Sequence, residues 1–365
     1  MSDSASKPDV CGVAACLGST YDAAMKPVSK DAMATIADVA RRAGTSKATV
    51  SRVLNRPDTV KLELREAVER AMRELAYVPL GAARSLATKR TRTIGAVVPT
   101  VDNAIFARFL DALQSELSEH GMLLLLASSW YEPERELAEV RALVERGVEG
   151  IALIGTSRDP GTYELLRARD LPCVLGMVCD EALPVNSVGW NNRLEMRKVA
   201  NFMIDLNHRH LAMVAGITKD NDRARDRVIG AQEAARDRGL TIDPRDIVEA
   251  RYSIEAGRAG MAQLLRRRPR PTAVMCGNDV LAVAAVLEAL SQGLQIPRDI
   301  SITGFDDLEL AANFFPPLTT MHVHADEIGR NAARLLLTHR ERGGRPEAVY
   351  LRPDLIVRDT TVPPR

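Results

Sequence analysis

The sequence lacks the patterns that would mark several common classes of protein. No stretch approaches the roughly 18 consecutive apolar residues that a membrane-spanning helix needs, so no membrane partner is expected. No phosphate-binding P-loop and no dinucleotide-binding glycine fingerprint precedes a helical pattern. The cysteines are odd in number and lack zinc-ligand spacing with any histidine pair: Cys11, Cys16, Cys173, Cys179 and Cys276. We therefore expect reduced thiols, no metal site and no cofactor.

The histidines do not suggest catalysis either. His208 and His210 stand two residues apart, as do His322 and His324, and neither pair has carboxylates at metal-ligand spacing. An enzyme would need a nucleophile beside a base, or a metal cluster, and the sequence offers neither pattern. We therefore expect a protein that is not an enzyme.

The first 32 residues stand apart from the patterns that follow them. Their short apolar patch, Val10–Leu17, follows no basic segment, because Lys7 is offset by neighbouring aspartates, so a signal peptide is not expected. Two alternatives stay open for residues 1–32. They form a disordered N-terminal extension, or translation of the native protein begins at Met33. In either case we expect a cytoplasmic protein.

The composition predicts a folded chain with more than one domain, because 365 residues of which 46% are hydrophobic can bury a sizeable core. The formal net charge is only +1, but it is unevenly distributed. Residues 33–92 hold thirteen Lys and Arg against six Asp and Glu, which leaves this segment at +7 and the remainder at −6. A segment this basic is typical of contact with nucleic acid.

Residues 33–55 have the pattern of two short helices joined by a glycine-bearing turn. Thr35 is an N-cap candidate, and Asp38 stands at capping-box spacing, so the first helix is predicted to begin near Ile36. Ser46 is a second N-cap before a helix over Lys47–Leu54. Helices this short cannot form a core alone, and apolar residues at helical spacing predict a third helix: Val60, Leu64, Val68, Met72 and Leu75.

The second of these helices is predicted to leave a polar face outward. Lys47 and Arg52 can reach phosphates or guanine edges, and Ala48 can lie against a thymine methyl group. A basic helix face by itself is more often merely solvated. The caps, the turn and the third helix favour instead an all-α helix-turn-helix DNA-binding domain over residues 33–79.

From Thr93 onward, short apolar runs alternate with amphipathic helices, which predicts about nine strands in parallel sheets with helices on both faces. This many strands exceed one comfortable sheet, so we expect two α/β lobes. Eight of these strands are predicted by range: Thr93–Pro99, Leu123–Ala127, Gly150–Ile154, Pro172–Leu175, His210–Val214, Ile247–Ala250, Ala273–Cys276 and Ile300–Gly304. The predicted helices are Ala104–Glu119, Glu132–Arg146, Gly161–Ala168, Leu194–Leu206, Ala224–Arg238, Glu255–Arg266 and Val280–Gln292.

Polar residues that follow these strands are candidates for a ligand site. Ligands of parallel sheets bind at the carboxyl ends of the strands, so two such sheets direct their polar ends at one cleft. Asn278 and Asp306 follow predicted strands, and Arg227 ends a long loop predicted over Ala215–Asp226. With the aromatic Tyr252 they offer groups that suit vicinal hydroxyls and the apolar face of a sugar.

Other interpretations of these residues stay open. Taken alone, Asp306 and Asn278 are equally well explained as helix caps, and Asp279 is interpreted as the N-cap of the helix that follows it. The charged residues before Arg227 are equally well explained by exposure to solvent. If Arg223 points inward beside Arg227, the two guanidinium groups would favour an anionic effector such as a sugar acid.

The run TIADVARRAGTSKATVSRVLN resembles the N-terminal signature of the lactose repressor and purine repressor group of bacterial transcription regulators. The resemblance continues through Tyr77–Pro79 and Ala83–Leu86 and reaches about Arg358. It implies a homodimer, or a higher oligomer, that binds a pseudo-palindromic double-stranded operator under the control of a carbohydrate or sugar-acid effector. The DNA-contacting positions it implies are Thr35, Ser46, Lys47, Ala48, Thr49, Ser51, Arg52, Asn55, Arg84 and Leu86. The effector-binding positions it implies are Ile105, Phe106, Arg227, Tyr252, Asn278 and Asp306. Asn221 and Arg223 of the charged stretch are further candidates.

Residues 80–92 are neither strongly apolar nor amphipathic, which predicts a linker that orders only with a partner. The resemblance implies a hinge helix there, which forms on DNA and wedges Leu86 into the minor groove. It also implies a first-lobe wall at Ile105 and Phe106, where Ile105 replaces an aromatic ring and makes stacking on a planar base less favourable.

The expected domains are an extension over residues 1–32, the DNA-binding domain over 33–79 and the hinge over 80–92. A two-lobed, periplasmic-binding-protein-like domain for effector binding and dimerisation follows over 93–358, with a tail over 359–365. The most direct interpretation is a transcriptional repressor. The alternative is a sugar-binding protein without DNA function, which would need a signal peptide and would lack the basic segment over residues 33–92.

Removal of residues 1–32 is expected to leave operator affinity and the melting temperature unchanged, because these residues lack helical periodicity and precede a complete capping motif at Thr35. The measurement compares the full chain with a chain that begins at Met33, by gel mobility shift on an operator selected from random DNA and by calorimetry. A marked loss of either property would show that the extension contributes to binding or to folding.

Overall fold

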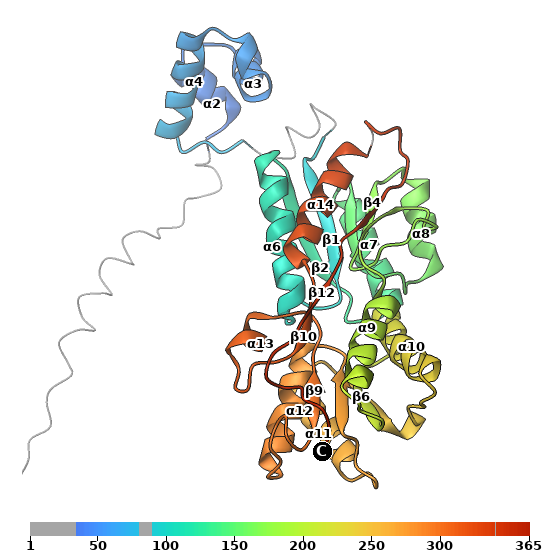
Figure 1. Cartoon of the computed structure of the whole chain (residues 1–365). Coiled ribbons are helices and arrows are strands. Elements are labelled where there is room, and N and C mark those ends of the chain that lie inside the picture. Colours follow the sequence, from blue (N-terminus) through green and yellow to red (C-terminus); the bar gives the residue numbers. More distant parts are fainter. Residues whose placement is uncertain (1–33, 80–89, 340) are drawn as a thin grey trace, which may run out of the picture. The chain divides into compact units, whose positions relative to one another are not determined.

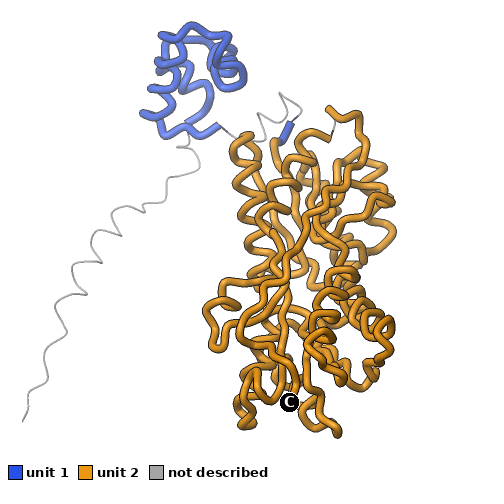
Figure 2. Tube along the Cα trace, viewed as in Figure 1, with its two compact units in different colours: residues 1–91 blue, residues 92–365 orange. Residues whose placement is uncertain are grey.

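The computed structural model describes residues 34–79, 90–339 and 341–365, and the chain divides into two compact units, residues 1–91 and residues 92–365 (Figure 2). The predicted DNA contacts of Arg84 and Leu86, the predicted extension and most of the predicted hinge lie outside the described residues. No helix in the described ranges combines the length and the apolar character that crossing a membrane requires.

The described part of the first unit is helical, as predicted. It contains α2 (Ile36–Arg42), α3 (Lys47–Asn55), the 3-10 turn η2 (Pro57–Thr59) and α4 (Leu62–Glu74) (Figure 1). The capping box is confirmed, because Thr35 Oγ1 accepts from the Asp38 amide at 3.4 Å and Asp38 Oδ2 accepts from the Thr35 amide at 2.9 Å. The second predicted cap is also confirmed, since Ser46 Oγ accepts from the Thr49 amide at 3.1 Å.

A small apolar core holds these helices together, and it draws on all of them. Its buried members are Val39, Ala40, Val50, Val53, Val68 and Ala71. The third helix is therefore required, because α2 and α3 would otherwise expose their apolar faces. Gly44, with a φ of +64°, supplies the left-handed conformation that the turn between α2 and α3 needs.

The first lobe of the second unit is a six-stranded parallel sheet in the order β11-β5-β4-β3-β1-β2. Its strands are β1 (Thr93–Val98), β2 (Leu123–Ser128), β3 (Ile151–Ile154), β4 (Cys173–Gly176), β5 (Asn186–Gly189) and β11 (Ala348–Tyr350). Its helices are α6 (Ala104–Glu119), α7 (Pro133–Glu145), α8 (Pro160–Ala168) and α14 (Ala325–Thr338) (Figure 1). Ile94 and Ala96 pack in the core cluster of α6 and α14, whereas Val97 packs in the cluster of α7 and α8, so helices cover both faces.

The second lobe is a four-stranded parallel sheet in the order β7-β6-β8-β9. Its strands are β6 (Leu211–Gly216), β7 (Ile247–Ala250), β8 (Ala273–Cys276) and β9 (Ser301–Thr303). Around it stand α9 (Asn192–Asp205), α10 (Asp222–Asp237), η3 (Pro244–Asp246), α11 (Ile254–Leu265), α12 (Asp279–Ser291) and α13 (Glu309–Asn313). Met213 packs with α9 and α10, whereas Val214 packs with α11 and α12, so this sheet too is covered on both faces.

The described chain passes between the lobes from β5 to α9, from β10 (Thr320–His322) to α14, and from β11 to β12 (Asp354–Ile356). The strands β10 and β12 pair antiparallel and form a separate two-stranded sheet beside the two predicted parallel sheets. These crossings carry α14 back from the second lobe to pack on α6 in the first. The described chain therefore crosses between the lobes at three places, which connect the two lobes covalently.

Every strand and helix predicted by range in this unit is present, and each end lies within two residues of its predicted position. The strands that were not predicted, β5, β10, β11 and β12, are only three or four residues long. Their pairing depends on neighbours that are distant in sequence, which a local pattern does not reveal. The helices α13 and α14 were not predicted either.

Gly329→Ala is expected to destabilise the second unit, because α14 approaches α6 closely at this glycine. An added Cβ would lie 2.4 Å from the Phe109 carbonyl oxygen and 2.8 Å from the Leu113 nitrogen. Overpacking of this kind costs about 1–3 kcal/mol, which calorimetry would detect as a lower melting temperature. Gly260→Ala in α11 is the matched control, since its nearest contact would be a side-chain methyl group at 3.3 Å. Equal melting temperatures for the two variants would contradict the packing argument.

Candidate functional site

The predicted DNA-contacting side of α3 is open to solvent. Lys47, Ala48 and Arg52 are exposed on this helix, and Thr35 and Ser46 are exposed at the N-terminal ends of α2 and α3. The remaining predicted positions in the described part of the first unit are half-buried: Thr49, Ser51 and Asn55. The first unit therefore presents a short helix with exposed basic and small side chains, which is what contact with a major groove requires.

A cleft of about 1230 Å³ opens between the lobes of the second unit. The first lobe contributes the loops that follow β1 and β2, and the second contributes the loops that follow β6 and β7 together with parts of α11 and α12. These loops stand at the carboxyl ends of parallel strands, the position at which such sheets bind ligands. Among the predicted effector-binding residues, Asn221 and Tyr252 line this cleft.

Arg227, on α10, is the centre of a buried polar cluster. Its guanidinium group donates to Asn192 Oδ1 at 3.0 Å and to the Gly277 carbonyl at 2.5 Å, and it lies 4.0 Å from Asp306 Oδ1. Its Cζ atom stands 3.7 Å from the centre of the Phe305 ring. Burial lowers the pKa of Arg227, and the carboxylate of Asp306 opposes this change. The cluster therefore joins α10, the start of α9 and the ends of β8 and β9.

Asp306 follows β9 in a strained backbone conformation, with a φ of +117°. Its amide donates to the Met321 carbonyl at 2.9 Å, which holds the turn against β10. Burial raises the pKa of Asp306 to about 7, and the guanidinium groups of Arg227 and Arg223 act in the opposite direction. The interpretation of Asp306 as a helix cap is wrong, because the next helix, α13, has Leu308 as its N-cap and no side-chain hydrogen bond there.

Asn278, not Asp279, is the N-cap of α12. Asn278 Oδ1 accepts from the Leu281 amide at 3.0 Å, while its Nδ2 is buried and has no hydrogen-bond partner within the described ranges. The prediction for Asp279 is wrong because its carboxylate accepts instead from Thr320 Oγ1 at 2.5 Å and from the Leu308 amide at 2.7 Å. Burial raises the pKa of Asp279 to about 8.

Two tyrosines connect the cleft with the Arg227 cluster. Tyr252 accepts a hydrogen bond from Asn221 Nδ2 at 3.5 Å, and its ring centre lies 6.0 Å from that of Tyr131 on the opposite lobe. Both tyrosines line the cleft. Burial raises the pKa of both hydroxyl groups, and the charge of Arg227 opposes this in each case. A ligand that displaced these rings would therefore contact the buried charged groups of the Arg227 cluster.

The charged stretch predicted as a loop over Ala215–Asp226 is mostly regular structure, which corrects that prediction. β6 extends to Gly216 and α10 begins at Asp222, so Arg223 lies in the first turn of a helix. Arg223 is 8% exposed and donates to Asp222 Oδ1 at 3.2 Å, so exposure to solvent does not explain it. Asp222 also accepts from the Thr156 amide at 2.9 Å and from Thr156 Oγ1 at 3.0 Å, which links the second lobe to the first.

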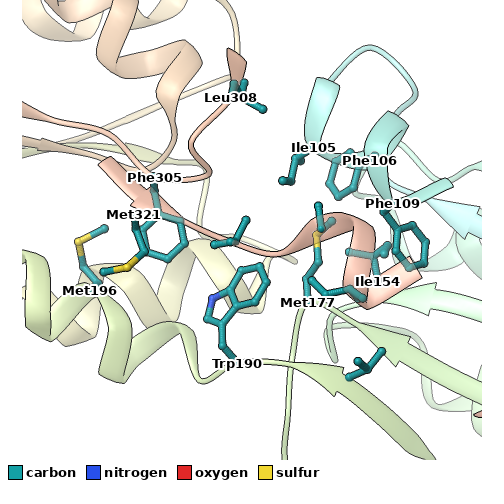
Figure 3. Packing of buried hydrophobic residues seen from close by; sticks show 14 of the residues in the cluster. Ile105, Phe106, Phe109, Ile154, Met177, Trp190, Met196, Phe305, Leu308 and Met321 are labelled. Atoms are coloured by element: carbon teal, nitrogen blue, oxygen red, sulfur yellow. The ribbon is translucent and has the colours of Figure 1, made fainter. Parts of the chain in front are cut away.

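Ile105 and Phe106, predicted as a wall of the effector pocket, are 4% and 3% exposed. They pack in the core cluster that extends from α6 across the lobe crossings, where Figure 3 shows them with Met177 and Trp190. Neither is among the residues that line the cleft. The N-cap of α6, Asn103, does line it, so the start of this helix faces the cleft while its next turn is buried.

Reasoning from the sequence missed several residues that contribute to this region: Trp130, Tyr131, Asn192 and Asp222. Asn192 follows β5, a strand of four residues that gave no recognisable pattern. Asp222 belonged to a charged run in which nothing distinguished a helix start from a loop, although Asn221 before it caps α10 through the Ala224 amide at 3.3 Å.

Comparisons with known proteins agree with both parts of this structure. The family model described as bacterial regulatory proteins, lacI family, matches residues 35–79, and the model of a periplasmic binding protein-like domain matches residues 200–361. The chain is 33% identical over 314 residues to the HTH-type transcriptional repressor CytR of Escherichia coli (strain K12), which covers 86% of this chain and 92% of that protein. It is 32% identical over 307 residues to the repressor PurR of Klebsiella pneumoniae (strain 342), with 84% and 90% covered.

Solved structures give the same result. The crystal structure of the Lac repressor dimer bound to operator and the anti-inducer ONPF superposes with a TM-score of 0.79 at 27% identity, covering 90% of this chain and 99% of that one. The exposed α3, the two-lobed domain and the repressors of similar sequence lead to one conclusion. The chain belongs to the lacI family of bacterial regulatory proteins, and it is a DNA-binding transcriptional regulator with an effector-binding domain, not an enzyme.

Proposed function

We propose that this repressor acts in the cytoplasm as a homodimer on a pseudo-palindromic operator, and that its effector is a carbohydrate bound where the lobes meet. The proposed binding residues are Asn221, Arg223, Arg227, Tyr252, Asn278 and Asp306. One observation carries the proposal: the buried Nδ2 of Asn278 has no hydrogen-bond partner within the described ranges, beside the Gly277 carbonyl that Arg227 contacts. A buried amide without a partner calls for a ligand group that accepts its hydrogen bond.

The chemistry of the cluster suits a polyol. Asp306 and the amides of Asn278 and Asn221 supply acceptors and donors, and a pair of adjacent hydroxyl groups can use both at once. Tyr252 adds an aromatic surface of the kind that covers the apolar face of a sugar ring. Ile105 and Phe106, the first-lobe wall that the resemblance implies, are buried in the core and offer no surface for stacking a planar base.

The charges favour a neutral sugar over the sugar acid that two free arginines would select. Arg223 lies 3.2 Å from Asp222, and Arg227 lies 4.0 Å from Asp306, so each guanidinium group already faces a carboxylate. An added carboxylate would have to compete with these pairs, and a buried charge without a full partner is costly. Tighter binding of the corresponding sugar acid than of the neutral sugar would contradict this preference.

The coupling to DNA follows from contacts that join the lobes. Asp222 binds Thr156 across the cleft, and Arg108 Nη1 donates to the Asp307 carbonyl at 3.3 Å next to Asp306. A ligand at Asp306 therefore changes groups that set the position of one lobe against the other. We infer that this movement is passed to residues 80–92 and alters operator affinity, for which a coupling of about 1–3 kcal/mol is enough.

Arg52→Ala is expected to weaken specific operator binding by roughly 1–3 kcal/mol and to relax the preference at one base position in each half-site, because this exposed guanidinium group reads a base edge. Gel mobility shift competition with single-base operator variants measures both effects. Arg70→Ala on α4 removes the same charge from the same unit and should leave base preference intact. Unchanged affinity and preference in the Arg52 variant would exclude it from base recognition.

Asp306→Asn and Arg227→Ala are expected to abolish the response to effector while leaving DNA binding by the unliganded protein intact. Loss of a charged hydrogen-bond partner in a desolvated site costs on the order of 2–5 kcal/mol, so affinity should fall by a factor of tens to thousands. Calorimetric titration with the sugar that a thermal-shift panel identifies is the measurement. Asp205→Asn, a substitution at an exposed carboxylate paired with Arg238, is the matched control. Parent-like ligand affinity in both cluster variants would refute the site.

A further inference from the structure

We propose that the cleft holds a second sugar-binding subsite built on Trp130, so that the effector is a disaccharide or a longer saccharide and not a single sugar. The inference rests on the proposed function, because the inner sugar is assigned to the Arg227 cluster. The proposal comes from the cleft between the lobes, which lies outside that buried cluster and has a volume of about 1230 Å³. Pockets that bury a drug-sized ligand measure about 300–1,000 Å³, so this cleft has room for more than a single sugar ring.

Trp130 is unusually exposed for a tryptophan side chain. Its side chain is 56% exposed and lines the cleft, although a soluble protein normally covers much of an indole ring. The guanidinium carbon of Arg135 stands 5.6 Å from the ring centre, which positions the indole by a cation–π contact. The ring is therefore held in place while much of its surface stays open to the cleft.

The backbone that presents this ring is strained. Trp130 and Tyr131 have φ values of +57° and +64°, and two consecutive aromatic residues rarely adopt the left-handed conformation. The amides of Ser129 and Trp130 donate to the carbonyls of Val98 and Pro99 at 3.0 Å and 2.8 Å, which secures the loop to the end of β1. Strain of this kind persists where the surrounding structure enforces it, and it directs both rings into the cleft.

The opposite wall of the cleft complements an aromatic platform. Ile217 and Ile254 of the second lobe are 41% and 39% exposed and line the same cleft. Exposed polar residues line the same cleft, including Lys219, Arg251 and Glu255. An apolar surface facing charged and hydrogen-bonding side chains matches a sugar ring, which has apolar faces and a polar edge.

Tyr131 links this outer region to the inner cluster. Its ring centre lies 6.0 Å from that of Tyr252, which binds Asn221 next to the Arg227 cluster. Trp130, Tyr131 and Tyr252 all line the cleft, and this succession of aromatic residues gives the path along which the proposed saccharide would lie. A saccharide of two or more rings can follow this path, with its inner ring at Asp306 and the next ring on Trp130.

The first test is calorimetric titration of the full-length protein with D-glucose, maltose and cellobiose, and with D-galactose, lactose and melibiose. At least one disaccharide is expected to bind about tenfold more tightly than its monosaccharides. Trp130→Ala should remove that advantage and leave monosaccharide affinity within about twofold, whereas Trp130→Phe should restore most of it. Phe315→Ala is the matched control, because this aromatic is 87% exposed and lies outside the cleft lining.

A second measurement reads Trp130 directly. The chain has two tryptophans, and Trp190 is buried at 1% exposure, so quenching of the fluorescence by acrylamide reports mainly Trp130. The preferred disaccharide should protect the fluorescence from quenching, and the monosaccharide should not. Monosaccharide and disaccharide binding that Trp130→Ala leaves unchanged would overturn the subsite while the carbohydrate function stands. Failure of every saccharide to bind would overturn both.

Discussion

The second unit is organised around one buried guanidinium group. Arg227 binds Asn192, where the chain has just crossed from the first lobe, and the Gly277 carbonyl at the end of β8. It also stacks on Phe305 and faces Asp306 after β9. A buried charge must find partners on every side, because its desolvation cost is recovered only through them. The carboxyl ends of two strands and a lobe crossing are therefore held in one arrangement, and a ligand that alters it affects all of them.

Under the proposed function, the position of this cluster lets a bound effector act on both lobes at once. The lobes share a continuous apolar core through their crossings, with Trp190 and Phe305 at ring centres 6.2 Å apart, and packed cores of this kind do not deform gradually. Polar contacts such as Asp222 with Thr156 join the lobes through a few hydrogen bonds, whereas the crossing is joined by packed apolar side chains. Under the proposed function, effector binding therefore changes mainly the angle between two rigid lobes. A modest binding energy can drive a transition of this kind.

The helices of the first unit are stabilised in a different way. Its core is small, so its helices depend on caps, and Thr35 and Ser46 both provide them. The same scarcity of core leaves α3 with little of its surface buried, and its exposed side chains include Lys47 and Arg52, two of the thirteen Lys and Arg in residues 33–92. Stability and the proposed DNA contact therefore belong to opposite faces of a nine-residue helix.

Local patterns were enough to predict the caps at Thr35 and Ser46, the three helices of the first unit and the alternating strands and helices of the second, because capping and periodicity act within a few residues. They also placed Asn278 and Asp306 after strands, but they did not predict the roles of Asn278 and Asp279 at the start of α12. Those roles depend on Thr320 and the loop after β9, which are remote in sequence. In the same way Trp130 became a cleft residue, and Ile105 a core residue, only through the packing of one lobe on the other. The sequence alone determined which elements form, and the tertiary structure decided which side chains meet, since burial and pairing are properties of neighbours that only folding brings together.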